Sequence, residues 1–246
     1  RTDLGKEIRK AFVPRDENHT LLAVDYSQIE LRIVASVAED PGMMEAFHAG
    51  IDIHTATASK VFGVDVENVT KDQRYKAKSV NFGLIYGQGA FGLSQNLGIK
   101  RSEAKDLIEA YFEQFGGVNT YMDDTIKYCR DNGFVKTLMG RKRFIPDINS
   151  SNQTVVGFAE RNAINAPIQG SAADMIKLAM INIHNRFSQM DIGTRMLLQV
   201  HDELLFDVPK TELDEITAVI KEEMERAMPL KVPVIAEAGH GANWLE

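Results

Sequence analysis

The stretch Leu21-Leu22-Ala23-Val24-Asp25-Tyr26-Ser27-Gln28-Ile29-Glu30 places acidic residues directly after a short apolar run. A second stretch, Met196-Leu197-Leu198-Gln199-Val200-His201-Asp202-Glu203-Leu204, repeats this arrangement near the other end of the chain. Short apolar runs of this kind predict buried β-strands. Carboxylates brought together at strand ends repel each other unless a cation lies between them, and oxygen ligands favour Mg²⁺. We therefore predict one β-layer that carries both Asp25 and Asp202. Aspartate is also common at helix N-caps and in turns, so Asp25 as an N-cap and Asp202 as a hairpin-turn residue remain alternatives.

The composition is that of a soluble globular protein of one large or two modest domains. The chain has 246 residues, of which 44% are hydrophobic and 26% charged. Cys129 is the only cysteine, which excludes an internal disulfide and suits a reducing compartment, so we expect a cytoplasmic protein. No signal peptide, transmembrane helix or membrane partner is predicted. The chain starts without Met and in the middle of a pattern, which suggests a fragment of a longer polypeptide.

Charge is unevenly distributed along the chain. The net charge is −7, and the acidic excess of residues 201–225 accounts for all of it. Residues 71–78 and 134–146 are basic. This asymmetry is compatible with a local phosphate-binding face, although solvated helix faces also produce such runs.

The periodicity predicts an α+β fold, in which a β-layer built from both ends of the chain encloses a mostly helical insertion. Gly87, Gly89 and Gly92 indicate a tight loop, and Pro167 with Gly170 indicates a kink in a long helix. Strands are expected to end near residue 25 and to span 195–200, 203–208 and 232–238; a hairpin is expected at 134–148; helices are expected at 28–37, 43–48, 54–62, 70–85, 102–115, 118–130, 153–190 and 211–226.

One helix has an unusual face. Thr70 and Gln73 form a capping-box pattern at its start, and Arg74, Lys78, Phe82 and Tyr86 then recur at steps of four. The cations suit a polyphosphate, and the aromatic rings offer flat surfaces to a sugar or base. A helix with a solvated basic end and a buried aromatic end is the alternative.

In combination, these segments resemble the three signature motifs of the family A DNA polymerases, most of all their bacterial members. The first motif is similar to Asp25-Tyr26-Ser27-Gln28-Ile29-Glu30-Leu31-Arg32, the second to Arg74-x3-Lys78-x3-Phe82-x3-Tyr86-Gly87, and the third to His201-Asp202-Glu203. The resemblance extends from about Ile8 to the C-terminus. It implies an antiparallel β-sheet palm at residues 1–35 and 151–246, with helical fingers at 36–150 and no thumb.

The resemblance also implies an enzyme, a DNA-directed DNA polymerase core that acts in replication and repair. Its partners would be primer–template DNA and deoxynucleoside triphosphates, and it would act as a monomer. Two-metal nucleotidyl transfer would extend a primer 3′-hydroxyl and release pyrophosphate. Without a thumb, the fragment is expected to bind DNA weakly and to be weak or inactive alone.

The resemblance assigns roles to individual residues. Two Mg²⁺ ions, with Mn²⁺ as a substitute, would be bound by Asp25, Asp202 and the Tyr26 carbonyl, with Glu203 as an accessory ligand. Lys78 would protonate the leaving pyrophosphate. The nucleotide-binding residues would be Gln28, Glu30, His54, Arg74, Lys78, Phe82 and Tyr86, with Glu30 and Tyr86 forming a gate against a ribose 2′-hydroxyl; Arg161, Asn165, Gln169 and His201 would contact the DNA.

The sequence leaves several alternative interpretations of these residues open. His54 could be an ordinary histidine, Glu30 a surface helix residue, and Asn165 and Gln169 caps around Pro167. A metal-dependent nuclease would also use paired aspartates, but it would not need the face of Arg74, Lys78, Phe82 and Tyr86. A non-catalytic binding module is a second rival. Synthesis of RNA is a third, and Glu30 at the gate position argues against it.

Overall fold

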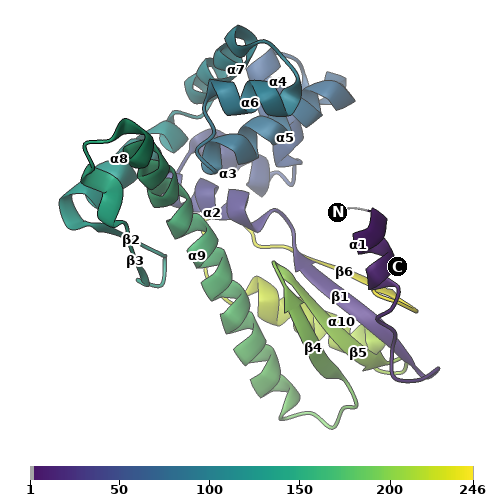
Figure 1. The fold of residues 1–246 in the computed structure, drawn as a ribbon. Coiled ribbons are helices and arrows are strands. Elements are labelled where there is room, and N and C mark those ends of the chain that lie inside the picture. The colour runs from purple at the N-terminus through teal and green to yellow at the C-terminus, as the bar shows by residue number, and fades with distance from the viewer. Residues whose placement is uncertain (1–2, 246) are drawn as a thin grey trace. The chain divides into compact units, whose positions relative to one another are not determined.

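The chain forms two compact units, seen in a computed structural model that describes residues 3–245 (Figure 1). Three residues of the predicted palm lie outside the described residues: Arg1 and Thr2 at the start of its first segment, and Glu246 at the end of its second. The first unit comprises the chain up to Ile29, Ala172–Pro229 and the chain from Val234; the second comprises Glu30–Ser171 and Leu230–Pro233.

The first unit contains a four-stranded antiparallel sheet, which confirms the predicted α+β class. Its order is β4-β5-β1-β6, so β1 from near the N-terminus lies between strands from the end of the chain (Figure 1). The register pairs Asp25 with Glu203 on one side and with Glu237 on the other. The elements of this unit are α1 (Asp3–Arg9), β1 (His19–Tyr26), β4 (Arg195–Val200), β5 (Glu203–Pro209), α10 (Leu213–Glu225) and β6 (Ala236–Gly241), together with the last part of α9 (Gln153–Phe187).

Alternation along β1 gives the sheet two different faces. Leu22, Val24 and Tyr26 are buried on the face that packs against α10, and the Tyr26 hydroxyl donates a hydrogen bond to the carbonyl of Met224 on that helix (2.7 Å). Successive side chains point to opposite faces of a strand, so Asp25 points away from α10. Ile216, Ile220 and Met224 form the buried stripe of α10.

The second unit is built mainly from helices. In α5, the predicted capping box is present: Thr70 Oγ1 accepts from the Gln73 amide (3.2 Å), and Gln73 Oε1 accepts from the Thr70 amide (2.9 Å). Its elements are α2 (Ile29–Ala38), α3 (Pro41–His48), α4 (Ile53–Phe62), the 3₁₀ turn η1 (Val66–Asn68), α5 (Lys71–Ile85), α6 (Ala90–Leu97), α7 (Arg101–Gln114), α8 (Gly116–Asn132), β2 (Phe134–Lys136), β3 (Lys142–Phe144), η2 (Pro146–Asn149) and the first part of α9.

The predicted hairpin around Gly140 is present as the β2–β3 pair. It covers a small separate core in which the side chains of α8, η2 and α9 meet. No helix formed by the described residues is both long and apolar enough to cross a membrane. The core residues are Cys129, Val135, Ile145, Ile148, Ala159 and Ala163, with Ala166 partly buried against them.

Three local expectations were wrong. The predicted loop around Gly92 contains helix α6, which is bounded by the extended Gly89 and the left-handed Gly98. The last strand begins at Ala236 rather than residue 232. Its extent is set by hydrogen-bonded pairing with β1, which includes Gly239 and Gly241. The break between α7 and α8 falls at Phe115.

Gly117 lies in the first turn of α8 rather than in a linker. Its amide donates to Oδ2 of the buried Asp40 (3.0 Å), and a Cβ at Gly117 would lie 3.0 Å from the Ala38 carbonyl and from Asp40 Cα. The sequence therefore has glycine here because two backbones approach closely, and not because the helix ends.

Candidate active site

The two signature aspartates lie at one end of the first unit's sheet. Asp25 is the penultimate residue of β1, and Asp202 lies in the two-residue turn between β4 and β5. The Tyr26 amide donates a hydrogen bond to the Asp202 carbonyl (3.1 Å). The prediction that both aspartates share one β-layer is confirmed. The N-cap alternative for Asp25 is wrong, whereas Asp202 is a turn residue as its alternative proposed.

A row of acids crosses three strands on the face that points away from α10. Directly opposed residues of antiparallel strands project from the same face, so Glu203, Asp25 and Glu237 lie side by side. Glu237 was not identified from the sequence, because only the register of β6 places it beside Asp25. Glu203 is held at its other side by the indole of Trp244 (2.5 Å) and by Arg9 (3.9 Å).

The pKa of Asp25 is raised above its usual value. Loss of surrounding water is the main cause, and repulsion from Asp202, Glu237 and Glu203 adds to it. The side chain of Asp25 is nevertheless exposed at the rim of a cavity of about 210 Å³ that Glu203 and Trp244 also line.

Within residues 3–245, no cluster of three or more His, Cys, Asp or Glu side chains is arranged to hold a metal. Two carboxylates suffice for Mg²⁺ when substrate phosphates complete its shell, and the hard oxygen donors here fit that ion.

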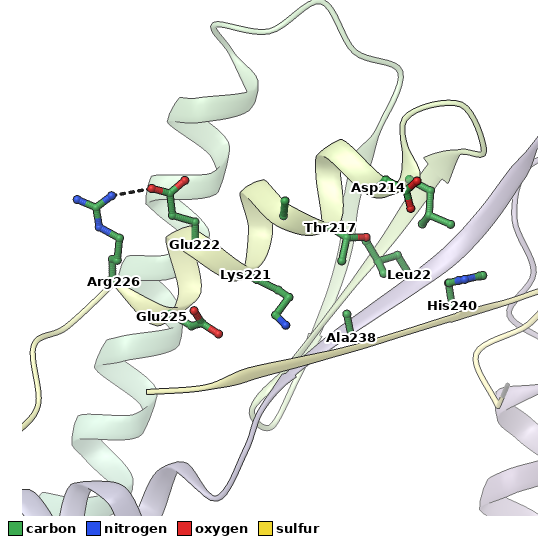
Figure 2. Close-up of a pocket in the computed structure, with 11 residues that line it drawn as sticks. Leu22, Asp214, Thr217, Lys221, Glu222, Glu225, Arg226, Ala238 and His240 are labelled. Carbon is green, nitrogen blue, oxygen red and sulfur yellow. Dashed lines mark hydrogen bonds and ion pairs between the residues drawn. The ribbon is translucent and has the colours of Figure 1, made fainter. Parts of the chain in front are cut away.

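A larger cavity of about 590 Å³ lies on the opposite face of the same sheet, against α10 (Figure 2). Leu22, Ala238 and His240 of the sheet and Thr217 and Lys221 of the helix line it. Asp25 projects from the other face, so this cavity is separate from the acidic row.

In the second unit, α5 presents the predicted row of cations and aromatic rings. Arg74 and Lys78 are exposed and Phe82 is half-buried, while Ala77, Val80, Leu84 and Ile85 bury the opposite face. The Tyr86 side chain is 41% exposed. The Phe82 and Tyr86 rings are nearly parallel, with an interplanar angle of 15° and centroids 6.3 Å apart. The aromatic end of this face is therefore not buried, contrary to the alternative interpretation.

Arg74 is oriented by a carboxylate. Its Nε and Nη2 donate to Oδ2 and Oδ1 of Asp52, both at 2.9 Å, in a bidentate pair. Asp52 also caps α4 by accepting from the amide and hydroxyl of Thr55 (2.8 and 2.7 Å). Burial raises the pKa of Asp52, but the hydrogen bonds from Arg74 and Thr55 outweigh burial and lower it below its usual range.

His54 lies beside this face as a buried, neutral imidazole. Its ring centroid is 5.5 Å from that of Phe82, and Asn81 Nδ2 lies 3.1 Å from its Nδ1. Its pKa is lowered to about 4, mainly by burial; the charge of Asp52 opposes this shift, and the charges of Arg74 and Lys78 add to it. His54 is therefore uncharged at neutral pH.

The predicted gate pair is in direct contact. The Tyr86 hydroxyl donates a hydrogen bond to Oε2 of Glu30 (2.7 Å), which joins the end of α5 to the first turn of α2. Gln28 belongs to the first unit and adopts a left-handed backbone conformation (φ 53°).

Three of the predicted DNA-contacting residues share one helix face. Arg161, Asn165 and Gln169 recur at steps of four on α9. The helix continues through Pro167, so Asn165 and Gln169 do not cap a break; the hydroxyl of Ser171 donates to the Pro167 carbonyl (2.6 Å). His201 belongs to the first unit, where it lies in the β4–β5 turn with a left-handed backbone (φ 57°).

Arg161 also packs against Gly87, which follows α5 with φ 71°. A Cβ at Gly87 would lie 2.8 Å from Arg161 Cβ and would also collide with its Cγ. Only glycine fits here, because both the backbone conformation and the space require it.

Comparison with known proteins gives consistent matches over the whole chain. Residues 1–246 match the family model described as DNA polymerase family A. DNA polymerase I of Streptococcus pneumoniae (strain ATCC BAA-255 / R6) is 52% identical over 247 residues, which cover 100% of this chain and 28% of that protein. DNA polymerase I of Geobacillus stearothermophilus is 48% identical over 246 residues, with 100% and 28% covered.

A solved structure agrees with these relatives. It is the POL domain of Pol1 from M. smegmatis in complex with DNA primer-template and dNTP, and it matches with a TM-score of 0.95 at 46% identity. The match covers 100% of this chain and 43% of the solved one. The chain thus spans less than a third of the length of the two polymerase relatives.

The acidic row predicts a stability cost at neutral pH. Asp25→Asn should raise the unfolding temperature at pH 7 in a chelator by about 2 °C, which corresponds to less than about 1 kcal/mol for a chain of this size. The gain should vanish as the pH falls toward 3.8, because a carboxyl group with a raised pKa destabilises the fold only where it is ionised. Thermal unfolding followed by circular dichroism measures both effects.

Asp16→Asn is the matched control. Its hydrogen bond with His19 lowers the pKa of Asp16, so this change should lower the unfolding temperature at pH 7. An Asp25→Asn variant no more stable than the original chain at pH 7 would contradict the proposed repulsion.

Gly87→Ala should destabilise the second unit through both strain and collision. We expect a loss of about 2–3 kcal/mol in denaturant unfolding. Gly50→Ala is the control, because Gly50 has a similar φ of 68° but nothing within 4 Å of its Cβ position, and it should lose only about 1 kcal/mol. Equal losses for the two variants would show that contact with Arg161 plays no part.

Proposed function

The chain belongs to DNA polymerase family A, and from that membership we propose that it is the catalytic core of a DNA-templated DNA polymerase. In the proposed reaction, the primer 3′-oxygen forms a bond to the α-phosphorus of a deoxynucleoside triphosphate. The bond from that phosphorus to the bridging oxygen breaks, and pyrophosphate leaves. The membership confirms the resemblance inferred from the three motifs, and the residue roles below are proposals that it supports.

We assign metal binding to the carboxylates of Asp25 and Asp202 and the carbonyl of Tyr26. When bound, two Mg²⁺ ions, or Mn²⁺ in their place, would activate the primer hydroxyl and neutralise charge on the triphosphate and the leaving group. The strand register supports this assignment, because it holds Asp25 beside Glu203 and Glu237, and a cation would relieve the mutual repulsion of these acids. Glu203 is accessory, since Trp244 and Arg9 already engage it.

The polyphosphate would be bound by Arg74, Lys78 and His54. The Arg74 guanidinium is already oriented by Asp52, which reduces the entropy lost when it binds a phosphate. Lys78 is exposed on the same face and would transfer a proton to the leaving pyrophosphate. Gln28 is proposed as a further nucleotide contact.

Selection of deoxyribose would come from Glu30 and Tyr86. Their 2.7 Å hydrogen bond fixes both side chains, so a ribose 2′-hydroxyl that displaced it would leave a polar group unpaired. Phe82 would pack against the sugar. Its half-buried ring is already held beside His54 and Tyr86.

The DNA would contact Arg161, Asn165 and Gln169 on one face of α9, and His201. We propose that these residues test the shape of the new base pair in the minor groove, where all correct pairs present acceptors.

In this proposal, residues 1–35 and 151–246 form the palm and 36–150 the fingers. The chain would act as a cytoplasmic monomer in replication and repair, and would be weak alone because few of its residues grip duplex DNA.

The ordered face of α5 is the observation that carries the proposal. A metal-dependent nuclease would share the paired aspartates, but hydrolysis does not require a cation–aromatic row with a carboxylate–tyrosine pair at its end. A role limited to DNA binding would leave the acidic row unexplained.

Primer extension tests the proposal directly. With a labelled primer–template at low salt, Mg²⁺ and all four deoxynucleoside triphosphates, we expect slow elongation that falls at least about 100-fold in Asp202→Asn. A shortened primer would instead support a nuclease. A wild-type chain that binds both substrates without elongating the primer would support a binding module.

A further inference from the structure

A buried polar network lies between α4 and α5, behind the face that carries Arg74 and Phe82. It consists of His54 and Thr57 on α4 and Asn81 on α5, whose exposed fractions are 3%, 0% and 0%. Interfaces between helices are normally apolar, and polar groups buried there must be hydrogen-bonded to be tolerated. Each member of this network finds its partner in another member.

The Asn81 amide nitrogen lies beside Nδ1 of His54, and this contact indicates which imidazole nitrogen carries the proton. Asn81 Nδ2 donates to Nδ1 of His54 (3.1 Å) and to Oγ1 of Thr57 (3.0 Å), while Thr57 Oγ1 donates to Oδ1 of Asn81 (3.2 Å). An amide nitrogen can only donate, so Nδ1 of His54 must present its lone pair. A neutral imidazole with an unprotonated Nδ1 carries its hydrogen on Nε2.

The charges around His54 keep the ring neutral. Arg74 and Lys78 of α5 oppose its protonation, whereas Asp52, the N-cap residue of α4, favours protonation. Burial opposes the charged form most strongly. Asp52 is also engaged by Arg74 and Thr55, so its charge is already neutralised in part.

We propose that Asn81 is a positioning residue that, braced by Thr57, holds His54 as the neutral Nε2–H tautomer so that Nε2 donates to an oxygen of the nucleotide's polyphosphate. This inference rests on the nucleotide-binding role proposed above for His54. A neutral donor adds directional selectivity beside the cations Arg74 and Lys78 without further charge. The fixed ring also holds its neighbour Phe82, whose centroid is 5.5 Å away.

Histidine nitrogen NMR tests the tautomer without any nucleotide. The chain would be labelled with ¹⁵N-histidine, and the His54 signals assigned with His54→Gln. The wild type should show only the Nε2–H tautomer, with no titration between pH 5 and 8. Asn81→Asp replaces the donor with a carboxylate oxygen, so Nδ1 should become protonated and His54 should titrate within that range. An Nδ1–H tautomer in the wild type would overturn the proposal.

Asn81→Ala covers the case in which a buried aspartate prevents folding. Loss of the amide should give a mixture of both tautomers, whereas Thr57→Ser retains the hydroxyl and should keep the wild-type tautomer. An unchanged single tautomer in Asn81→Ala would show that other contacts orient His54, and would overturn the role of Asn81.

Nucleotide binding provides the second readout, by calorimetric titration with deoxyadenosine triphosphate and Mg²⁺. His54→Gln and Asn81→Ala should each weaken binding by about 3- to 10-fold, and the double variant should lose no more than His54→Gln alone. Additive losses would overturn the proposal. Unimpaired binding in His54→Gln, with primer extension still dependent on Asp202, would overturn this inference and leave the polymerase proposal standing.

Discussion

Strand pairing holds several carboxylates close together, and the proposed metal chemistry of this protein depends on the repulsion between them. The antiparallel register of β1 with β5 and β6 places Asp25 between Glu203 and Glu237, and the turn after β4 adds Asp202. The backbone hydrogen bonds of the sheet and the packing of Leu22, Val24 and Tyr26 against α10 hold these acids in place. The sheet therefore holds acids that repel one another, and a cation at the proposed site would relieve that repulsion.

In the second unit, the side chains of the α5 face are ordered in a different way. Each side chain of the α5 row has a neighbour that limits its motion: Asp52 orients Arg74, His54 and Tyr86 flank Phe82, and Glu30 binds Tyr86. Gly87 lets the chain turn directly after the row while Arg161 packs against it. Preorganisation of this kind reduces the ordering cost when a ligand binds. The buried Asn81 and Thr57 extend the same principle to His54.

Features determined by local sequence were predictable, and features determined by distant pairing were not. The strand ending near Asp25, the capping box at Thr70 and the hairpin at Gly140 depend on neighbours within a few residues. The start of β6 and the acid Glu237 depend on register with β1, which no periodicity encodes. Helix α6 was missed because Gly89 and Gly92 also suit a loop, and the contact of Asn81 with His54 depends on packing between two helices.

At the proposed site, a bound divalent cation relieves the repulsion around Asp25. The most direct measurement compares the unfolding temperature in MgCl₂ with that in KCl of equal ionic strength, which provides the same general screening. We expect a larger stabilisation by Mg²⁺ in the wild-type chain, and no such excess in the double variant Asp25→Asn/Asp202→Asn. An equal excess in the double variant would place the cation elsewhere and contradict the proposed site.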